Sequence, residues 1–128
     1  MVDIRDIPQA EFEVMEVLWR KGAATVKEVQ AVVGKKRKAA YTTVATLLAR
    51  LKEKGYVSAE ERNFAYVFKP LVPRERVVRR KLDDLVRRVL GGKLGPLAAY
   101  IAENRKLSKE QIEVLEAIIR AESHEKKR

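Results

Sequence analysis

The hydrophobic period of this chain changes abruptly at Gly55. Before this residue, apolar side chains recur every three to four positions, and after it they alternate over two short runs, 56–60 and 64–68. The first spacing is typical of amphipathic helices and the second of strands with one buried face. The sequence therefore predicts helices followed by a β-hairpin, with residues 60–63 as its turn.

Two helical segments open the chain. The first is predicted from Pro8 to Gly22, because proline suits the first helical position and glycine ends a helix readily. The second begins at Thr25, which forms a capping-box pattern with Glu28, and ends at Gly34. Both segments carry apolar residues at helical spacing, so we expect them to share a core.

A third helix is expected from Ala40 to Lys54, with Gly55 in a left-handed conformation beyond its end. At about 100° per residue, its two sides differ in character. The apolar side carries Val44, Leu47, Leu48 and Leu51, and the opposite side carries Thr42, Thr43, Thr46 and Arg50. Threonine is a mediocre helix former, so a side built only for stability would use other residues. The threonine side is therefore interpreted as a recognition surface.

Three helices followed by a hairpin is the element order of a winged helix-turn-helix. In that fold the third helix enters the major groove of DNA and the hairpin, or wing, lies along the backbone. Threonine and alanine are small enough to let a helix approach the bases, and threonine can contact a thymine methyl group or bond a base edge. The predicted fold class is mainly α with a small β-hairpin wing, a winged helix-turn-helix followed by a C-terminal helical dimerisation domain.

The positive charge of the chain is concentrated where this interpretation needs it. The formal net charge is +10, and residues 35–54 hold 7 basic groups and 1 acidic group, whereas residues 1–34 hold 4 and 6. Such a concentration indicates a polyanionic partner, most simply double-stranded DNA. The acidic residues Glu11, Glu13 and Glu16 lie on the first helix, which is expected to face away from DNA. The candidate DNA contacts from these arguments are Lys35, Lys36, Arg37, Lys38, Tyr41, Thr42, Thr43, Thr46, Arg50 and, on the wing, Arg62.

The C-terminal part is predicted to be helical but too short to bury its own apolar stripes. Units below roughly 70 residues seldom supply an adequate core alone. The expected domains are therefore 1–73, which binds DNA, and 74–128, which pairs with a second copy; folding back onto the first domain is the alternative. The candidate dimerisation residues are Val78, Leu82, Leu85, Val89, Ile112, Leu115, Ile118 and Ile119.

Catalysis and metal binding find no support in the sequence. The chain has no cysteine, its single histidine, His124, lies near the end, and the adjacent Asp83 and Asp84 point about 100° apart on a helix. Neither an enzyme nor a cofactor is expected, and no metal site. The absence of a long apolar run and of a secretion signal predicts a cytoplasmic protein with no membrane binding of its own.

Four stretches of the chain, "AEFEVMEVLW", "YTTVATLLARLKEKGYV", "AYVFKPLV" and "GGKLGPLAAYIAENRKLSKEQIEVLEAII", resemble the BlaI/MecI/CopY family of bacterial repressors. The resemblance covers nearly the whole chain in order. It implies a winged-helix domain, a helical dimerisation domain and repression at palindromic operators. It also implies that Thr42, Thr43, Thr46 and Arg50 face the operator and that Tyr66 contacts the DNA backbone. In the antibiotic-responsive branch a membrane sensor peptidase drives cleavage of the repressor.

The chain departs from the family pattern at two places. Many relatives have Gly-Arg at the wing turn where this chain has Asn63-Phe64, so Arg62 is the expected replacement. The cleaved Asn-Phe bond of the resistance repressors aligns with Tyr100-Ile101, the candidate cleavage region. Without cysteine, copper sensing through thiolates is excluded. Two other functions stay open, a ligand-gated winged-helix regulator and a winged-helix module that binds a protein partner.

Overall fold

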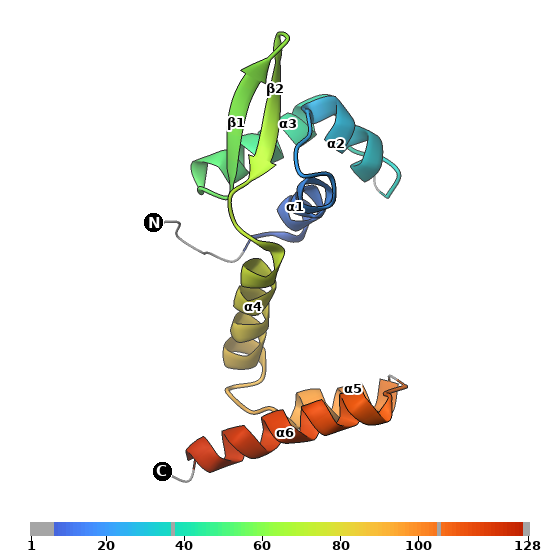
Figure 1. The fold of residues 1–128 in the computed structure, drawn as a ribbon, viewed down its shortest axis with the longest axis vertical. Coiled ribbons are helices and arrows are strands. Elements are labelled where there is room, and N and C mark those ends of the chain that lie inside the picture. Colours follow the sequence, from blue (N-terminus) through green and yellow to red (C-terminus); the bar gives the residue numbers. More distant parts are fainter. Residues whose placement is uncertain (1–6, 37, 105, 127–128) are drawn as a thin grey trace. The chain divides into compact units, whose positions relative to one another are not determined.

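The computed structural model describes residues 7–36, 38–104 and 106–126 of the chain. The elements, in order, are α1 (Gln9–Lys21), α2 (Val26–Val33), α3 (Tyr41–Glu53), β1 (Val57–Arg62), β2 (Ala65–Pro70), α4 (Arg74–Asp84), the π-helical turn η1 (Leu85–Val89), α5 (Gly95–Asn104) and α6 (Lys109–Lys126) (Figure 1). In the described part, the predicted order of three helices and a hairpin is confirmed.

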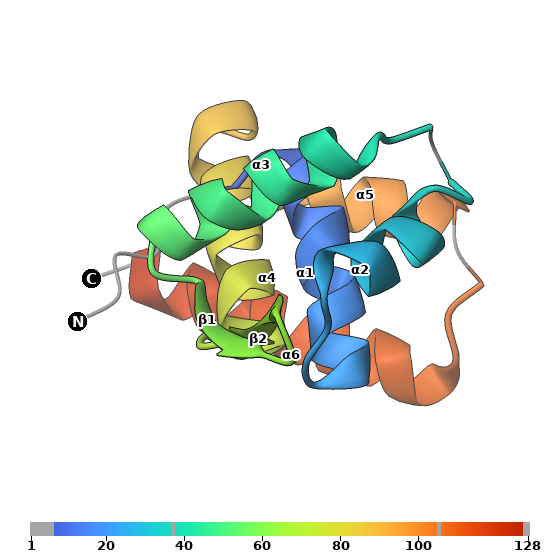
Figure 2. The ribbon, with the colours of Figure 1, turned by 90° about the horizontal axis from the view of Figure 1, so that it is seen from above.

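Helices α1, α2 and α3 each pack against the other two and enclose the core of the N-terminal unit (Figure 2). Side chains with an exposed fraction of 0% come from all three: Val14, Met15, Leu18, Val29, Val44, Leu48 and Leu51. Leu47, also predicted to be buried, is partly buried against this cluster. Burying each such side chain stabilises the fold by about 1.5–3 kcal/mol, so the apolar side of α3 fixes which side faces outward.

Local capping explains where α2 begins and where α3 ends. The Thr25 backbone N–H donates to Glu28 Oε1 at 3.0 Å, and the Glu28 N–H donates to Thr25 Oγ1 at 3.2 Å, which confirms the capping box. The Thr25 backbone N–H, followed by the Thr25 side chain, lowers the pKa of Glu28 below its ordinary value. Gly55 has φ 86°, the left-handed conformation expected after α3. Pro8 was predicted to be the first helical residue but stands at the N-cap of α1, one position before the first helical residue, Gln9.

The hairpin is longer than predicted, and the predicted turn at residues 60–63 is wrong. β1 pairs with β2 in antiparallel register from Val57 opposite Pro70 to Arg62 opposite Ala65. The turn is therefore Asn63-Phe64, and both residues have positive φ, 49° and 64°. Two-residue hairpin turns need this conformation because its twist matches that of the strands.

A backbone bridge ties the hairpin to the connection between α1 and α2. The Ala24 N–H donates to the Phe68 carbonyl oxygen at 3.0 Å, and the Phe68 N–H donates to that of Ala24 at 2.8 Å. Phe68 is also buried in the core. The base of the wing is thus fixed to the helices, while its turn projects away from them (Figure 1).

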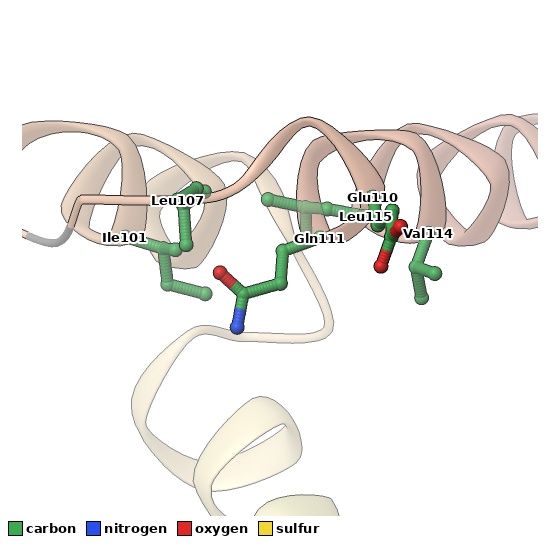
Figure 3. A pocket seen from close by; sticks show the side chains of 6 residues that line it. All are labelled: Ile101, Leu107, Glu110, Gln111, Val114 and Leu115. Carbon is green, nitrogen blue, oxygen red and sulfur yellow. The ribbon is translucent and has the colours of Figure 1, made fainter.

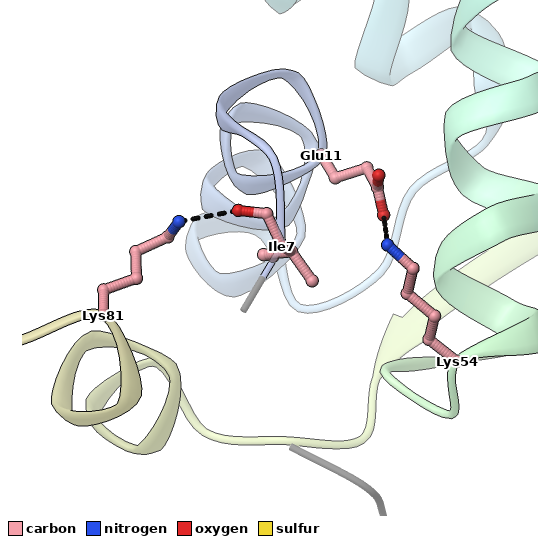
Figure 4. Close-up of polar contacts among 4 residues, drawn as sticks. All are labelled: Ile7, Glu11, Lys54 and Lys81. Carbon is pink, nitrogen blue, oxygen red and sulfur yellow. Dashed lines mark hydrogen bonds and ion pairs between the residues drawn. The ribbon is translucent and has the colours of Figure 1, made fainter. Parts of the chain in front are cut away.

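The chain divides into two compact units, and the first extends further than the sequence division at residue 73. One unit ends at Lys81 and the other begins at Leu82. Val77 is 1% exposed in the core of the first unit, the Trp19 indole N–H donates to the Val72 carbonyl at 2.8 Å, and Lys81 Nζ donates to the Ile7 carbonyl at 2.7 Å (Figure 4). The beginning of α4 therefore belongs structurally with α1–α3.

Candidate nucleic-acid interface

The outward side of α3 carries the predicted recognition residues. Thr42, Thr43, Thr46 and Arg50 are exposed, as is Ala49 between them. Because Val44, Leu48 and Leu51 are buried on the other side, α3 cannot rotate without opening the core. The first turn of α3 contains no acidic residue, and its last turn contains Arg50 and Lys52. The exposed side of α3 is therefore narrow, rich in small residues and basic at one end.

One hydrogen bond limits what the threonines can do. Thr46 Oγ1 donates to the Thr42 carbonyl oxygen at 2.9 Å, one turn back along α3. This bond uses the hydroxyl hydrogen of Thr46 inside the helix. Its methyl group and the acceptor sites of its oxygen remain for a ligand. Thr46 is therefore better suited to meet a thymine methyl group than to donate to a base.

The basic turn between α2 and α3 is held at both ends. Lys35 and Lys36 follow Gly34 in backbone turns, and the Gln30 side-chain amide donates to the Ala39 carbonyl at 3.2 Å. Gly34 is needed there, since a Cβ atom would lie 2.8 Å from the Gln30 carbonyl oxygen. Lys35, Lys36 and Lys38 are exposed beside the start of α3, and Arg37 lies outside the described residues.

The wing contributes an exposed tyrosine to the candidate interface, whereas its arginine is engaged in an ion pair. Arg62 is exposed, but its Nη2 atom lies 3.1 Å from Glu60 Oε2, so the expected phosphate contact competes with an ion pair. Tyr66 is 55% exposed, and Tyr41 at the start of α3 is 49% exposed. These two tyrosines line a groove of about 510 Å³ between the wing and the α2 and α3 helices.

The acidic residues of α1 were correctly placed on that helix, but sequence reasoning missed what they contact. The Glu11 side chain is 2% exposed, and its Oε1 atom accepts a bond of 2.7 Å from Lys54 Nζ at the end of α3 (Figure 4). Glu16 pairs with Arg74 at 3.0 Å. Lys54 therefore anchors α3 to α1 and adds no charge to the exposed side of α3. No local sequence pattern near Lys54 predicted its ion pair with Glu11.

The predicted dimerisation residues differ in their exposure. Three of them are exposed, namely Leu82 at 50%, Val89 at 71% and Ile112 at 41%. Three are partly buried, namely Leu85, Leu115 and Val78, which lies in the first unit. The side chains of Ile118 and Ile119 lie outside what the structure describes. Among the described residues, every buried apolar side chain lies at or before Val77. The second unit therefore has no fully buried apolar core within the described part.

An apolar hollow lies between α5 and α6 of the second unit. Its volume is about 470 Å³, and Ile101, Leu107, Val114 and Leu115 line it together with Glu110 and Gln111 (Figure 3). At the start of α6, the Ser108 backbone N–H donates to Gln111 Oε1 at 2.9 Å and the Gln111 N–H donates to Ser108 Oγ at 3.1 Å. Within the described ranges, no helix is long and apolar enough to cross a membrane.

The candidate cleavage region lies inside a helix. Tyr100 and Ile101 belong to α5, and Tyr100 is 56% exposed. The Tyr100 carbonyl oxygen accepts a bond of 3.0 Å from the Asn104 side chain. A protease would have to unwind this helix to reach the bond, and cleavage here stays a prediction.

A family model, curated relatives and solved structures all match this chain. The sequence model of a family described as penicillinase repressor matches residues 7–121. The penicillinase repressor of Bacillus licheniformis is 28% identical over 127 residues, which cover 99% of each chain. The solution structure of the DNA-binding domain of the repressor BlaI is 30% identical, with a TM-score of 0.52, and the match covers 58% of this chain and 90% of that one. The Bacillus licheniformis BlaI monomer in complex with the blaP half-operator is 29% identical, with a TM-score of 0.50, over 59% of this chain and 92% of that one.

Proposed function

Because this chain belongs to the penicillinase repressor family and is a DNA-binding transcriptional repressor, not an enzyme, we propose that it represses as a homodimer bound to a palindromic operator. In this proposal α3 of each subunit lies in the major groove, and the C-terminal helices join the subunits. The observation that carries it is the exposed side of α3, where small hydroxyl-bearing residues lie between Arg50 and the basic turn. Its site of action is the cytoplasm, where a bacterial chromosome is found.

The exposed residues divide into two roles. Lys35, Lys36 and Lys38 lie on a turn beside α3 and are suited to phosphate contacts, which give affinity without sequence information. Thr42, Thr46 and Arg50 lie on α3 itself and are suited to base edges. Tyr41 and Tyr66 border the groove between α3 and the wing and are suited to the sugar-phosphate backbone.

The homodimer is supported by the surface of the second unit. Its exposed apolar residues include Val89, Ile112 and Val114, and they have no buried core beneath them within the described part. A two-fold interface would cover them and present two α3 helices to half-sites separated by about one turn of DNA. A membrane sensor peptidase as a second partner is implied by the family resemblance alone.

Footprinting on the DNA upstream of its own gene tests the operator. We expect two protected half-sites with centres about 10 base pairs, or a multiple of that, apart. Affinity for this DNA should fall steeply as salt concentration rises. A winged-helix module that binds only protein would show neither protection nor a salt-dependent DNA affinity, and this result would refute the proposal.

The salt dependence also tests the basic turn. Replacing Lys35, Lys36 and Lys38 with alanine should reduce the slope of log K against log salt by about 0.9 for each lost phosphate contact. The matched control replaces Lys93, Lys106 and Lys109, three exposed lysines of the second unit. Equal slopes for the two triple variants would remove the basic turn from the interface.

Sedimentation tests the dimer. We expect the wild-type protein to sediment as a dimer and Val114→Asp, at a position 60% exposed in the second unit, to shift it toward the monomer. Leu71→Asp is the control, since Leu71 is 55% exposed in the first unit. A wild-type monomer at the concentrations that protect DNA would contradict the dimer.

A further inference from the structure

Phe64, at the tip of the wing, combines two unfavourable features. Its φ of 64° is left-handed, a conformation that glycine or asparagine adopts easily and a bulky side chain rarely does. Its exposed fraction is 101%, so no described part of the chain covers the ring. Asn63 before it suits the turn, but the second turn position would ordinarily favour glycine. Backbone strain and an uncovered aromatic ring at one residue point to a role in binding.

The ring lies beside the candidate DNA interface. Phe64 borders the same groove as Tyr41 of α3 and Tyr66 of β2. Its position is therefore continuous with two predicted DNA contacts. This continuity favours DNA over an unrelated partner as the group that meets the ring.

The wing has the length to reach the next groove of the duplex. β1 and β2 have six residues each, which span about 20 Å at roughly 3.3 Å per residue. One turn of DNA rises about 34 Å, so the major and the adjacent minor groove are separated by about 17 Å along the axis. With α3 in the major groove, the turn at residues 63–64 can lie at the minor groove.

The charge near the tip excludes a purely electrostatic contact there. Glu60 and Glu61 outnumber Arg62, and Arg62 already pairs with Glu60 at 3.1 Å. A wing that relied on phosphate attraction would carry the opposite balance. The group at the tip that can gain from contact with DNA is the apolar ring of Phe64. Apolar side chains inserted between base steps from the minor groove are an established means of bending DNA.

We propose that Phe64 is a DNA-binding residue whose ring enters the minor groove beside the α3 site and partly unstacks a base step. This inference rests on the operator binding proposed above and adds a specificity element to it. Flexible pyrimidine–purine steps cost least to unstack, so such a step is favoured under the wing. The strain at Phe64 is the local cost of presenting the ring.

The test is Phe64→Gly, which removes the ring and relieves the backbone. The probe is a short fluorescein-labelled duplex carrying the footprinted operator. We expect thermal stability to be equal or higher and affinity for the duplex to fall about tenfold, in line with aromatic–base stacking. Leu71→Ala, at a position 55% exposed away from this groove, is the control and should leave affinity unchanged.

Chemical footprinting separates the ring from the rest of the interface. Hydroxyl radicals attack sugars from the minor groove, and dimethyl sulfate attacks guanine in the major groove. Phe64→Gly should lose radical protection at one minor-groove patch in each half-site and keep the major-groove protection. Phe64→Trp should keep both, with tryptophan fluorescence quenched on binding relative to the wild-type signal of Trp19.

Three outcomes overturn the inference. If wild type binds the operator and Phe64→Gly binds equally well, Phe64 is not a contact, while the proposed function stands. If Phe64→Gly melts at a lower temperature and loses protection in both grooves, the ring is structural. If the wild-type protein protects no duplex, the proposed function and this inference fail together.

Discussion

The Lys54–Glu11 ion pair offers the sharpest test of how α3 is held. The Glu11 side chain is 2% exposed and that of Lys54 is 26% exposed, with 2.7 Å between Nζ and Oε1. Lys54→Met keeps most of the aliphatic stem but leaves the Glu11 carboxylate buried without its cation. Removing one partner of a fully buried pair costs about 3–5 kcal/mol. Because Lys54 is a quarter exposed and water can reach its place, we expect a loss of about 2–3 kcal/mol in the free energy of unfolding.

The partner substitution should cost less, and this asymmetry is the prediction. Glu11→Met removes the buried carboxylate, and Lys54 can still reach solvent, so we expect a loss of about 1 kcal/mol. In the double variant with methionine at both positions, no buried charge is left, and stability should return to within about 1 kcal/mol of wild type. The non-additivity of the three variants measures the coupling of the pair.

The assay is urea unfolding at neutral pH, followed by circular dichroism and by Trp19 fluorescence at one protein concentration. Arg74→Met is the control, because the Arg74–Glu16 pair has a similar length, 3.0 Å, but side chains that are 54% and 33% exposed. An exposed pair contributes about 0–1 kcal/mol. Equal losses for Lys54→Met and Arg74→Met, or a double variant as unstable as the sum of its single variants, would refute the reasoning.

Three further predictions follow from other contacts. Leu48→Ala empties a site with no solvent exposure and should cost about 3–5 kcal/mol, measured as a lower urea midpoint with an unchanged slope. The Thr46 hydroxyl donates to the Thr42 carbonyl, which leaves the methyl group of Thr46 to meet the DNA. Thr46→Val keeps this methyl group and should bind the operator nearly as well as wild type, whereas Thr46→Ser lacks it and should bind less well. The reverse order of affinities in an anisotropy titration would show that the hydroxyl contacts the base. The pKa of Glu28 is lowered first by the Thr25 backbone N–H and second by the Thr25 side chain, so the capping contribution of Glu28 is complete above the ordinary glutamate pKa and is lost as pH falls through the lowered value. Thr25→Ala removes the second cause and should raise this pKa part of the way in a carbon-13 NMR titration, and an unchanged value would contradict the capping account.

The helices and their outward sides could be predicted because local rules determine them. The capping box at Thr25 and the left-handed Gly55 are sequence patterns with one structural solution each. Apolar spacing placed Val44, Leu48 and Leu51 in the core, and the exposed position of Thr42 and Thr46 follows from it. Whether a residue of α3 faces the core or the solvent is therefore largely determined by its position along the helix.

Contacts between distant residues could not be predicted, because no local pattern encodes them. Glu11 and Lys54 are 43 residues apart, and each alone is typical of a solvent-exposed helix position. Val77 and Lys81 were expected to belong to the second domain, yet Val77 is buried in the first unit and Lys81 bonds to the Ile7 carbonyl. Although β2 ends at Pro70, the first unit continues to Lys81, because Val77 is buried in its core.

The wing turn shows how a misplaced boundary can conceal a functional residue. Residues 60–63 were predicted as the turn because they lie between the two alternating runs, but an exposed hairpin has no buried face near its tip that would exclude charged residues from a strand. The turn chemistry then decides the register, and Asn63 is the residue that accepts the left-handed conformation most readily after glycine. Once Asn63 is the first turn residue, Phe64 must be the second, where its ring has no neighbour to pack against. A sequence under selection for stability alone would place glycine there, so the presence of phenylalanine is itself an argument that the tip of the wing meets a ligand.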